Sequence, residues 1–192
     1  MRSGSKKPAR RQVLPLLMVG TGLIALGIAS FLLLPRPGQG AQKSERAVYA
    51  FPVAVDFPAP EIELRNLENQ PVSLADYPGK VILVNNWATW CPPCKAEMPT
   101  LEAYFRDHQA QDFVIIAIEA GEPAEEVAAF AREFSLSFPV WPDPGMRAQA
   151  SFKNDALPSS YVIDRQGQVR LAWTGPINRE LLEQYVSPLL EE

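Results

Sequence analysis

Cysteine and histidine are scarce in this chain. Its 192 residues include two cysteines, Cys91 and Cys94, and one histidine, His108. A structural zinc site takes four ligands, so no metal site is expected, and His108 is assigned to the surface. A disulfide between Cys91 and Cys94 would close a short loop and stabilise the fold by about 2 kcal/mol, against about 4–5 kcal/mol for a hundred-residue loop. The pair therefore favours redox chemistry over a metal site or a purely structural bridge.

Basic residues are few beyond the N-terminal quarter. Residues 47–192 carry 10 basic and 21 acidic residues, a net charge of −11, whereas residues 1–46 carry 8 against 1, or +7. Nucleic-acid-binding proteins present a basic patch or stripe. The acidic region has no such stripe, so a nucleic-acid partner is not expected.

Charge is absent altogether from residues 13–34, which are largely apolar. As a helix this run would span about 33 Å, enough to cross the hydrocarbon core of a bilayer. The preceding residues 1–12 contain five basic side chains, which favour a cytoplasmic N-terminus. We therefore expect a single-pass transmembrane anchor in the cell membrane, with the remainder of the chain outside the cytoplasm.

A cleaved signal peptide is the alternative reading of residues 13–34. Its apolar core would usually be about 7–15 residues long and end at a small-residue cleavage site. The run here is longer, and residues 35–42 match such a site poorly, which favours the anchor; both readings export the domain. Residues 35–56, rich in proline, glycine and glutamine, are expected to form a flexible tether.

Residues 57–192 have the pattern of one α/β domain. A short hairpin is predicted over 61–74, followed by a continuous apolar strand over 81–87. Apolar residues at helical spacing then predict a helix from the cysteines to His108, kinked at Pro99. The other predicted elements are strands at 113–118, 138–141, 159–163 and 168–173, and helices at 123–134, 145–152 and after Asn178. This alternation is typical of an α/β sandwich.

The two cysteines lie where a helix begins. The free N–H groups and the dipole of a helix N-terminus favour a thiolate, the reactive form of cysteine. Cys91 is expected to be exposed and to act as the nucleophile, while Cys94, about one turn into the helix, is expected to be shielded and to resolve the mixed disulfide. Neither Pro92 nor Pro93 has an N–H to donate, so we expect a less depressed thiol pKa and a less oxidising couple than in strong oxidants.

Two segments resemble the TlpA/ResA-type thioredoxin-like proteins. Residues 87–99, WATWCPPCKAEMP, resemble their active-site stretch, and residues 157–164, LPSSYVID, resemble their cis-proline loop and the strand after it. The helix and strand over 123–141 resemble the insertion of this family. The resemblance covers about 56–190 and implies a thioredoxin fold, a central mixed sheet flanked by helices, with an N-terminal hairpin and a helix–strand insertion.

The resemblance also implies roles around the cysteines. Pro158 would be cis rather than an ordinary strand-edge proline, and Leu157 would pair with the substrate backbone. Trp90 would flank the thiols and shape the docking surface, with simple packing as its alternative. Trp87 is assigned to the core.

This chain departs from the family pattern at the proton-handling positions. Classical thioredoxins have a buried aspartate where Asn85 stands, and some ResA-type members have glutamate where Pro92 stands. Glu119, at the end of the neighbouring predicted strand, is a candidate substitute, because strand ends in such sheets meet near the active site; a solvated loop carboxylate is the competing interpretation. Lys95 and Glu97 are assigned to a solvated helix face.

The leading functional hypothesis is a reductase of disulfides in exported proteins, with no cofactor beyond the redox-active pair Cys91–Cys94. The resemblance suggests apocytochrome c as substrate and a membrane thiol transporter of the DsbD/CcdA kind as electron donor. An oxidase or isomerase is the alternative within the enzyme class, since the same cysteines can run either way. A copper-handling module of related fold is the alternative from another class; such modules use a wider cysteine spacing and a distant histidine.

Overall fold

The computed structural model describes residues 49–191. The expected cytoplasmic N-terminus (1–12), the expected anchor (13–34) and most of the expected tether lie outside the described residues. Within residues 49–191, no helix is long and apolar enough to cross a membrane.

A six-stranded mixed sheet forms the centre of the domain, in the order β1-β8-β7-β4-β5-β6. β4, β5 and β6 are parallel to one another, and β7, β8 and β1 continue the sheet in antiparallel pairs. The strands are β1 (Val53–Pro58), β4 (Val81–Trp87), β5 (Phe113–Ala120), β6 (Val140–Asp143), β7 (Ser159–Ile163) and β8 (Gln168–Thr174). Every residue of β4 and β5 is buried, as their continuous apolar sequences require of strands covered on both faces.

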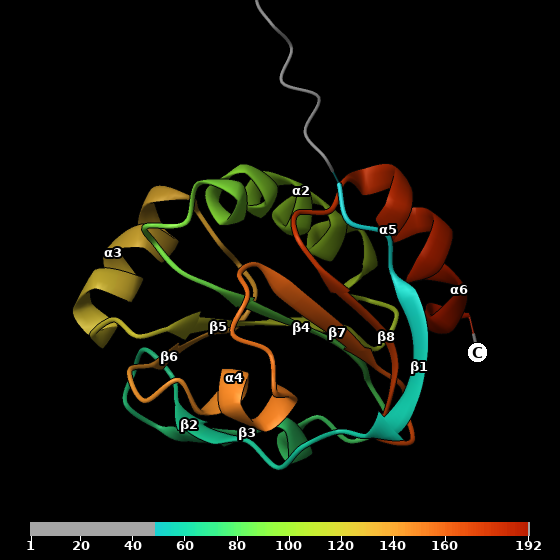
Figure 1. Ribbon diagram of the computed structural model, residues 1–192, viewed down its shortest axis with the longest axis horizontal. Helices are drawn as coiled ribbons and strands as arrows, with labels where there is room; N and C mark the ends of the chain where they lie inside the picture. Colours follow the sequence, from blue (N-terminus) through green and yellow to red (C-terminus); the bar gives the residue numbers. More distant parts are fainter. Residues whose placement is uncertain (1–48, 192) are drawn as a thin grey trace, which may run out of the picture. The chain divides into compact units, whose positions relative to one another are not determined.

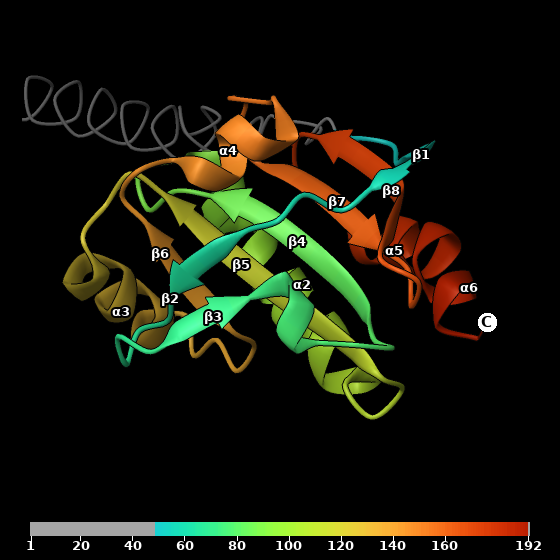
Figure 2. The ribbon, with the colours of Figure 1, turned by 90° about the horizontal axis from the view of Figure 1, so that it is seen from below.

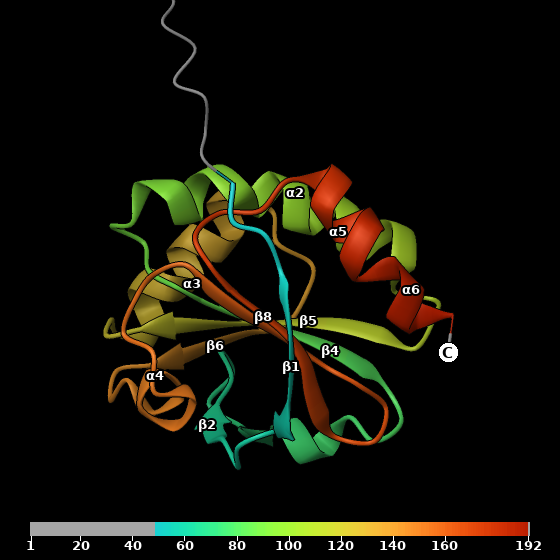
Figure 3. The ribbon, with the colours of Figure 1, turned by 45° about the vertical axis from the view of Figure 1, so that its right-hand side comes forward.

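Two layers cover the sheet (Figure 1). One face carries α2 (Pro92–His108), α3 (Ala124–Glu133), α5 (Arg179–Tyr185) and α6 (Ser187–Leu190). The other face carries the hairpin of β2 (Glu63–Arg65) and β3 (Pro71–Ser73), the 3₁₀ turn η1 (Leu74–Asp76) and α4 (Arg147–Phe152). Figures 2 and 3 show the hairpin lying across the sheet on the side opposite α2. The thioredoxin-like α/β fold expected from the sequence is confirmed.

One strand was not expected. β1 begins inside the segment interpreted as tether and crosses its expected end at residue 56. It pairs antiparallel with β8 at Val53↔Ala172 and Pro58↔Gln168. Most of its side chains are exposed, so its sequence lacks the buried apolar pattern from which a strand could be predicted. Its place in the sheet comes from the backbone hydrogen bonds that the edge of β8 offers. The domain therefore begins before residue 57.

The parallel strands bring distant residues to one edge of the sheet. β4, β5 and β6 all end there, so the loop that leads to the cysteines lies beside Glu119 near the end of β5 and Asp143 at the end of β6. Trp87, the last residue of β4, is buried as expected and pairs in register with Glu119. Carboxyl ends of neighbouring parallel strands are where α/β proteins build their sites.

Candidate active site

Cys91 and Cys94 form a disulfide at the start of α2. Cys91 is the N-cap residue of this helix, and Pro92 and Pro93 occupy the first two helical positions. An N-cap side chain accepts from the N–H of the second or third helical residue. Because Pro93 has no N–H, the donor is Cys94, whose N–H lies 3.3 Å from Cys91 Sγ. One backbone donor therefore reaches the sulfur.

Cys91 is less accessible than expected. In this disulfide form it is 4% exposed and Cys94 is fully buried, whereas the neighbouring Trp90 is 66% exposed. The expectation of an exposed Cys91 is wrong for the oxidised state, in which its sulfur is bonded to the inner cysteine and caps the helix. The order of accessibility is as expected, and the assignment of Cys91 as nucleophile and Cys94 as resolving thiol stays a prediction.

The Leu157–Pro158 peptide bond is cis, as the resemblance implied. β7 pairs antiparallel with β4 at Asn86↔Ser159, so Pro158 lies next to the end of β4, where the loop to Cys91 begins. Its carbonyl accepts a hydrogen bond from the N–H of Gly175 at 2.8 Å. The substrate-pairing role of Leu157 and the docking role of Trp90 stay predictions.

Glu97 is buried, so its assignment to a solvated helix face is wrong. It is 2% exposed, and its Oε1 accepts from Asn85 Nδ2 at 2.9 Å while its Oε2 accepts from the N–H of Ile177 at 3.1 Å. The same Asn85 nitrogen also donates to Ser160 Oγ at 3.0 Å. Burial raises the pKa of Glu97 to about 7, although both hydrogen bonds act to lower it.

The position of Glu97 along α2 brings it close to the chemistry. It follows Cys94 by three residues, which places the two on one face of the helix. A carboxyl group whose pKa is near neutrality can both take up and release a proton under working conditions. Asn85, which stands where thioredoxins have their aspartate, thus holds a carboxyl group rather than supplying one. The spacing of Cys94, Glu97, Met98 and Leu101 on the buried stripe of the helix was the signal that could have found it.

Glu119 is also buried and is not a solvated loop carboxylate. It is 0% exposed, and its Oε2 accepts from the N–H of Glu122 at 3.0 Å. Burial, then the neighbouring carboxyl groups of Glu122 and Asp143, raise the pKa of Glu119 to about 8. Glu122 in turn accepts from Thr89, through Oε1 from the hydroxyl at 2.7 Å and through Oε2 from the N–H at 3.2 Å. Although burial acts to raise it, these bonds hold the pKa of Glu122 below its usual value.

Comparison with known proteins agrees with this geometry. Residues 55–172 match the AhpC/TSA family. The chain is 35% identical over 137 residues to the thiol-disulfide oxidoreductase ResA of Geobacillus thermodenitrificans, covering 71% of this chain and 79% of that one. It is 31% identical over 129 residues to ResA of Halalkalibacterium halodurans, covering 67% and 73%.

Solved structures share the fold. A thiol:disulfide interchange protein of the thioredoxin family from Chlorobium tepidum superposes with a TM-score of 0.63 at 28% identity, covering 72% of this chain and 99% of that one. A secreted thiol-disulfide isomerase from Corynebacterium glutamicum superposes with a TM-score of 0.68 over 74% and 93%, and at 20% identity it supports the fold alone. The chain belongs to the AhpC/TSA family, among the ResA-type thiol-disulfide oxidoreductases. The chain carries the cysteine pair Cys91 and Cys94 as a disulfide, and its role as the reacting pair stays a prediction.

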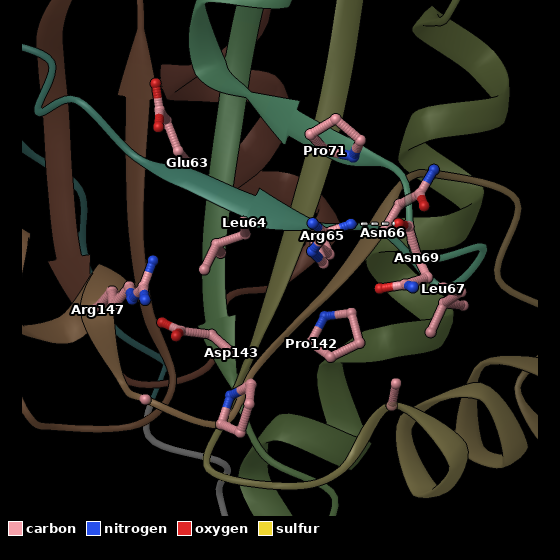
Figure 4. A pocket seen from close by; sticks show the side chains of 13 residues that line it. Glu63, Leu64, Arg65, Asn66, Leu67, Asn69, Pro71, Pro142, Asp143 and Arg147 are labelled. Carbon is pink, nitrogen blue, oxygen red and sulfur yellow. Dashed lines mark hydrogen bonds between the residues drawn. The ribbon is translucent and has the colours of Figure 1, made fainter.

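A separate cavity of about 570 Å³ is not part of this site (Figure 4). It lies between the β2–β3 hairpin and the loop after β6, and the side chains of Arg65, Asp143 and Arg147 line it. Neither cysteine nor Pro158 belongs to its lining. Over residues 49–191, no group of three or more histidine, cysteine or acidic side chains is placed to hold a metal ion.

His108 differs from its expected place at the surface of this ResA-type domain. It is half-buried late in α2, with its ring packed on Tyr104 at 4.3 Å between centroids. Its Nε2 lies 3.4 Å from Glu183 Oε1 in α5. These contacts join α2 to α5, far along the helix from the cysteines, so His108 stabilises the helical layer.

Proposed function

We propose that this ResA-type protein reduces disulfide bonds in exported proteins, working outside the cytoplasm on a membrane anchor. The observation that carries the proposal is the Cys91–Cys94 pair at the N-terminus of α2, with the outer sulfur as helix cap and the inner one fully buried. That arrangement supplies one attacking and one resolving thiol. The comparisons support thiol–disulfide exchange as the reaction.

The reaction moves two electrons from the reduced pair to the substrate. The Cys91 thiolate attacks one sulfur of the substrate disulfide, the other substrate sulfur leaves as a thiolate, and a mixed disulfide forms. Cys94 then loses its proton and attacks Cys91 Sγ. The second substrate sulfur is released, and the Cys91–Cys94 disulfide remains.

Glu97 is the group best placed to take the proton from Cys94. It lies three residues on along the same helix, buried, and its pKa of about 7 suits a general base at neutral pH. Asn85 and the N–H of Ile177 hold both of its oxygens. The structure thus favours Glu97 over Glu119 for the proton-handling role that the sequence left open.

The cap of α2 favours reduction over oxidation. Strong oxidants of this fold stabilise their reduced form, whose outer cysteine is a thiolate. Here prolines at the first two helical positions leave the N–H of Cys94 as the donor to Cys91, so the thiolate receives less stabilisation. We therefore assign the protein as a donor of electrons, with exported disulfides such as those of apocytochrome c as substrates and a membrane thiol transporter of the DsbD/CcdA kind as its own donor.

The reduction potential of the full-length protein tests this assignment. The protein is equilibrated with thiol–disulfide buffers of graded potential, and the fraction of Cys91–Cys94 disulfide is measured by thiol alkylation. A midpoint of about −220 mV or lower is expected for a reductase. A midpoint of about −120 mV would identify an oxidant of exported thiols and contradict the proposal. Cys94→Ser is the matched control, because it keeps Cys91 but has no internal disulfide to titrate.

A further inference from the structure

A relay of hydrogen bonds links β5 to the loop in front of the disulfide. It begins at Glu119, whose Oε2 accepts from the N–H of Glu122. The two carboxyl groups also act on each other: their side-chain interaction raises the pKa of Glu119 and lowers that of Glu122, as expected for neighbouring carboxyl groups that share one proton. Glu122 then binds Thr89 twice, through the hydroxyl at 2.7 Å and the N–H at 3.2 Å. Thr89 precedes Cys91 by two residues.

The contact between two carboxyl groups requires a proton. Glu119 Oε1 is buried, and within residues 49–191 no N–H or hydroxyl donor reaches it. Two ionised carboxylates in contact would repel, whereas a protonated carboxyl group becomes a donor to an ionised one. Glu119 is the fully buried member of the pair and Glu122 is the half-buried one that already receives two bonds from Thr89, so the proton belongs on Glu119.

The surrounding charges favour the same assignment. Asp143, on the neighbouring strand β6, is the other acidic group whose charge acts on Glu119, and it disfavours ionisation there. From α2, the ammonium group of Lys95 acts on Glu122 and favours its carboxylate form. The side chain that pairs with Glu119 from β4 is the uncharged Trp87.

We propose that Glu119 is a positioning residue of the active site: its protonated carboxyl group holds the Glu122 carboxylate against Thr89 and so fixes the segment that carries Trp90 and Cys91. The carbonyl of Ala88, next to Thr89, accepts from the N–H of Cys91 at 3.2 Å, so the held segment is continuous with the helix cap. Trp90, 66% exposed, lies in this held segment between Thr89 and Cys91. This positioning role deepens the proposed function, and its effect on the reaction rests on that function.

The relay is tested in the oxidised full-length protein, where no thiol titrates. The chain contains four threonines, so labelling the threonine methyl groups with carbon-13 gives at most four NMR signals. Thr89→Ser identifies the signal of Thr89 by its loss. We expect the Thr89 signal to shift in a single transition as the pH passes about 8, because an ionised Glu119 repels Glu122 and releases Thr89.

Substitutions then show which group titrates. Glu119→Gln keeps a neutral donor of the same shape and should abolish the transition. Glu122→Gln removes the like charge, so an ionised Glu119 no longer repels residue 122 and the transition at Thr89 should be lost. Glu125→Gln, an equal change of charge on an exposed residue of α3, is the matched control and should leave the transition in place.

Several outcomes would overturn the proposal. They are a Thr89 signal that stays constant between about pH 6 and 10, a transition that persists in Glu119→Gln, or one that persists in Glu122→Gln. The reduced protein gives a functional readout. The ratio of the wild-type disulfide-reduction rate to the Glu119→Gln rate should fall roughly two- to fivefold between pH 7 and pH 9. The NMR titration requires no turnover, so a failed reductase assay would count against the proposed function and leave the relay intact.

Discussion

Carboxyl groups are usually exposed and ionised at neutral pH, whereas in this site two of them are buried and have raised pKa values. Glu97 lies inside α2's packed face, where an ionised carboxylate loses its water but keeps hydrogen bonds from Asn85 and Ile177. These two bonds offset part of the desolvation, and the pKa settles near 7 rather than higher. Glu97 can therefore exchange a proton at neutral pH, at a cost to stability whenever it is ionised.

Glu97→Gln should flatten the pH dependence of stability. The pKa of Glu97 is about 7 in the folded protein against 4.5 in the unfolded chain, so its contribution is fully present below about pH 4.5 and is lost as the pH rises through 7. The wild type should lose about 3 kcal/mol of unfolding free energy from this group between pH 4.5 and pH 8. Glu97→Gln should remove that part of the slope, as measured by denaturant unfolding of the oxidised protein. An equal slope in both proteins would refute the assignment; Glu126→Gln, on an exposed position of α3, is the control.

How far the sequence predicts single residues depends on whether their environment is local. Cys91, Cys94 and the cis bond at Pro158 belong to short contiguous motifs, and the sequence was sufficient to single them out. Helical spacing could have placed Glu97 on the buried face of α2, but the groups that satisfy its carboxyl oxygens, Asn85 and the N–H of Ile177, lie 12 residues before it and 80 after it in the chain. Glu119 was singled out for its strand end, but its partner Glu122 and the contact of Glu122 with Thr89 could not be predicted from spacing.

At the scale of elements, the start of α2 determines the reactivity of the pair. The cap sulfur receives the N–H of Cys94, the third helical residue, while Pro93 removes the donor that the second helical residue would supply. The helix dipole still favours a thiolate at Cys91. The prolines therefore moderate a stabilisation that the helix itself provides.

Pro93→Ala should restore the missing donor. We expect the pKa of Cys91 to fall by about 1, since a hydrogen bond to a charged group contributes about 1.5–3 kcal/mol and geometry reduces its effect here. The pKa is read from the ultraviolet absorbance of the thiolate in a Cys94→Ser background, where Cys91 is the one thiol. Pro99→Ala, farther along the same helix, is the control and should leave the pKa in place. A Pro93→Ala pKa equal to or above that of the parent would contradict the argument.

Helices and strands could be predicted from the sequence where the apolar pattern and the flanking turn residues indicate the same boundaries. β4, β5, β7 and α2 have boundaries within a few residues of the expected ones, because each buries a continuous run or a helical stripe. β1 was missed because most of its side chains face solvent and its strand character comes from pairing with β8. Backbone pairing at a sheet edge leaves no mark in hydrophobic periodicity.

At the scale of the molecule, the site is assembled at one edge of the sheet from three directions. The loop after β4 brings Trp90 and Cys91, the end of β5 brings Glu119 and its partner, and the cis-proline loop before β7 lies beside them. The carbonyl of Pro176, in the loop after β8, accepts from the N–H of Ala50 at 2.9 Å, so the first described residues lie near the loop that contacts Pro158 through Gly175. The chain thus enters the domain on the side of the active site.

We predict that residues 13–34 anchor the full-length protein in the membrane. Residues 13–34 are uncharged and long enough to span a bilayer, so the full-length protein should stay in the membrane fraction after an alkaline wash and keep an intact N-terminus by mass spectrometry. Deleting residues 13–34 should leave the domain out of the membrane fraction, whereas deleting residues 36–42 should not, because the anchor is retained. Recovery of the wild-type protein in the soluble fraction, with its N-terminus beginning near residue 42, would show instead that the apolar run is a cleaved signal peptide. The active site would then act free of the membrane, and a membrane electron donor would have to reach it by diffusion.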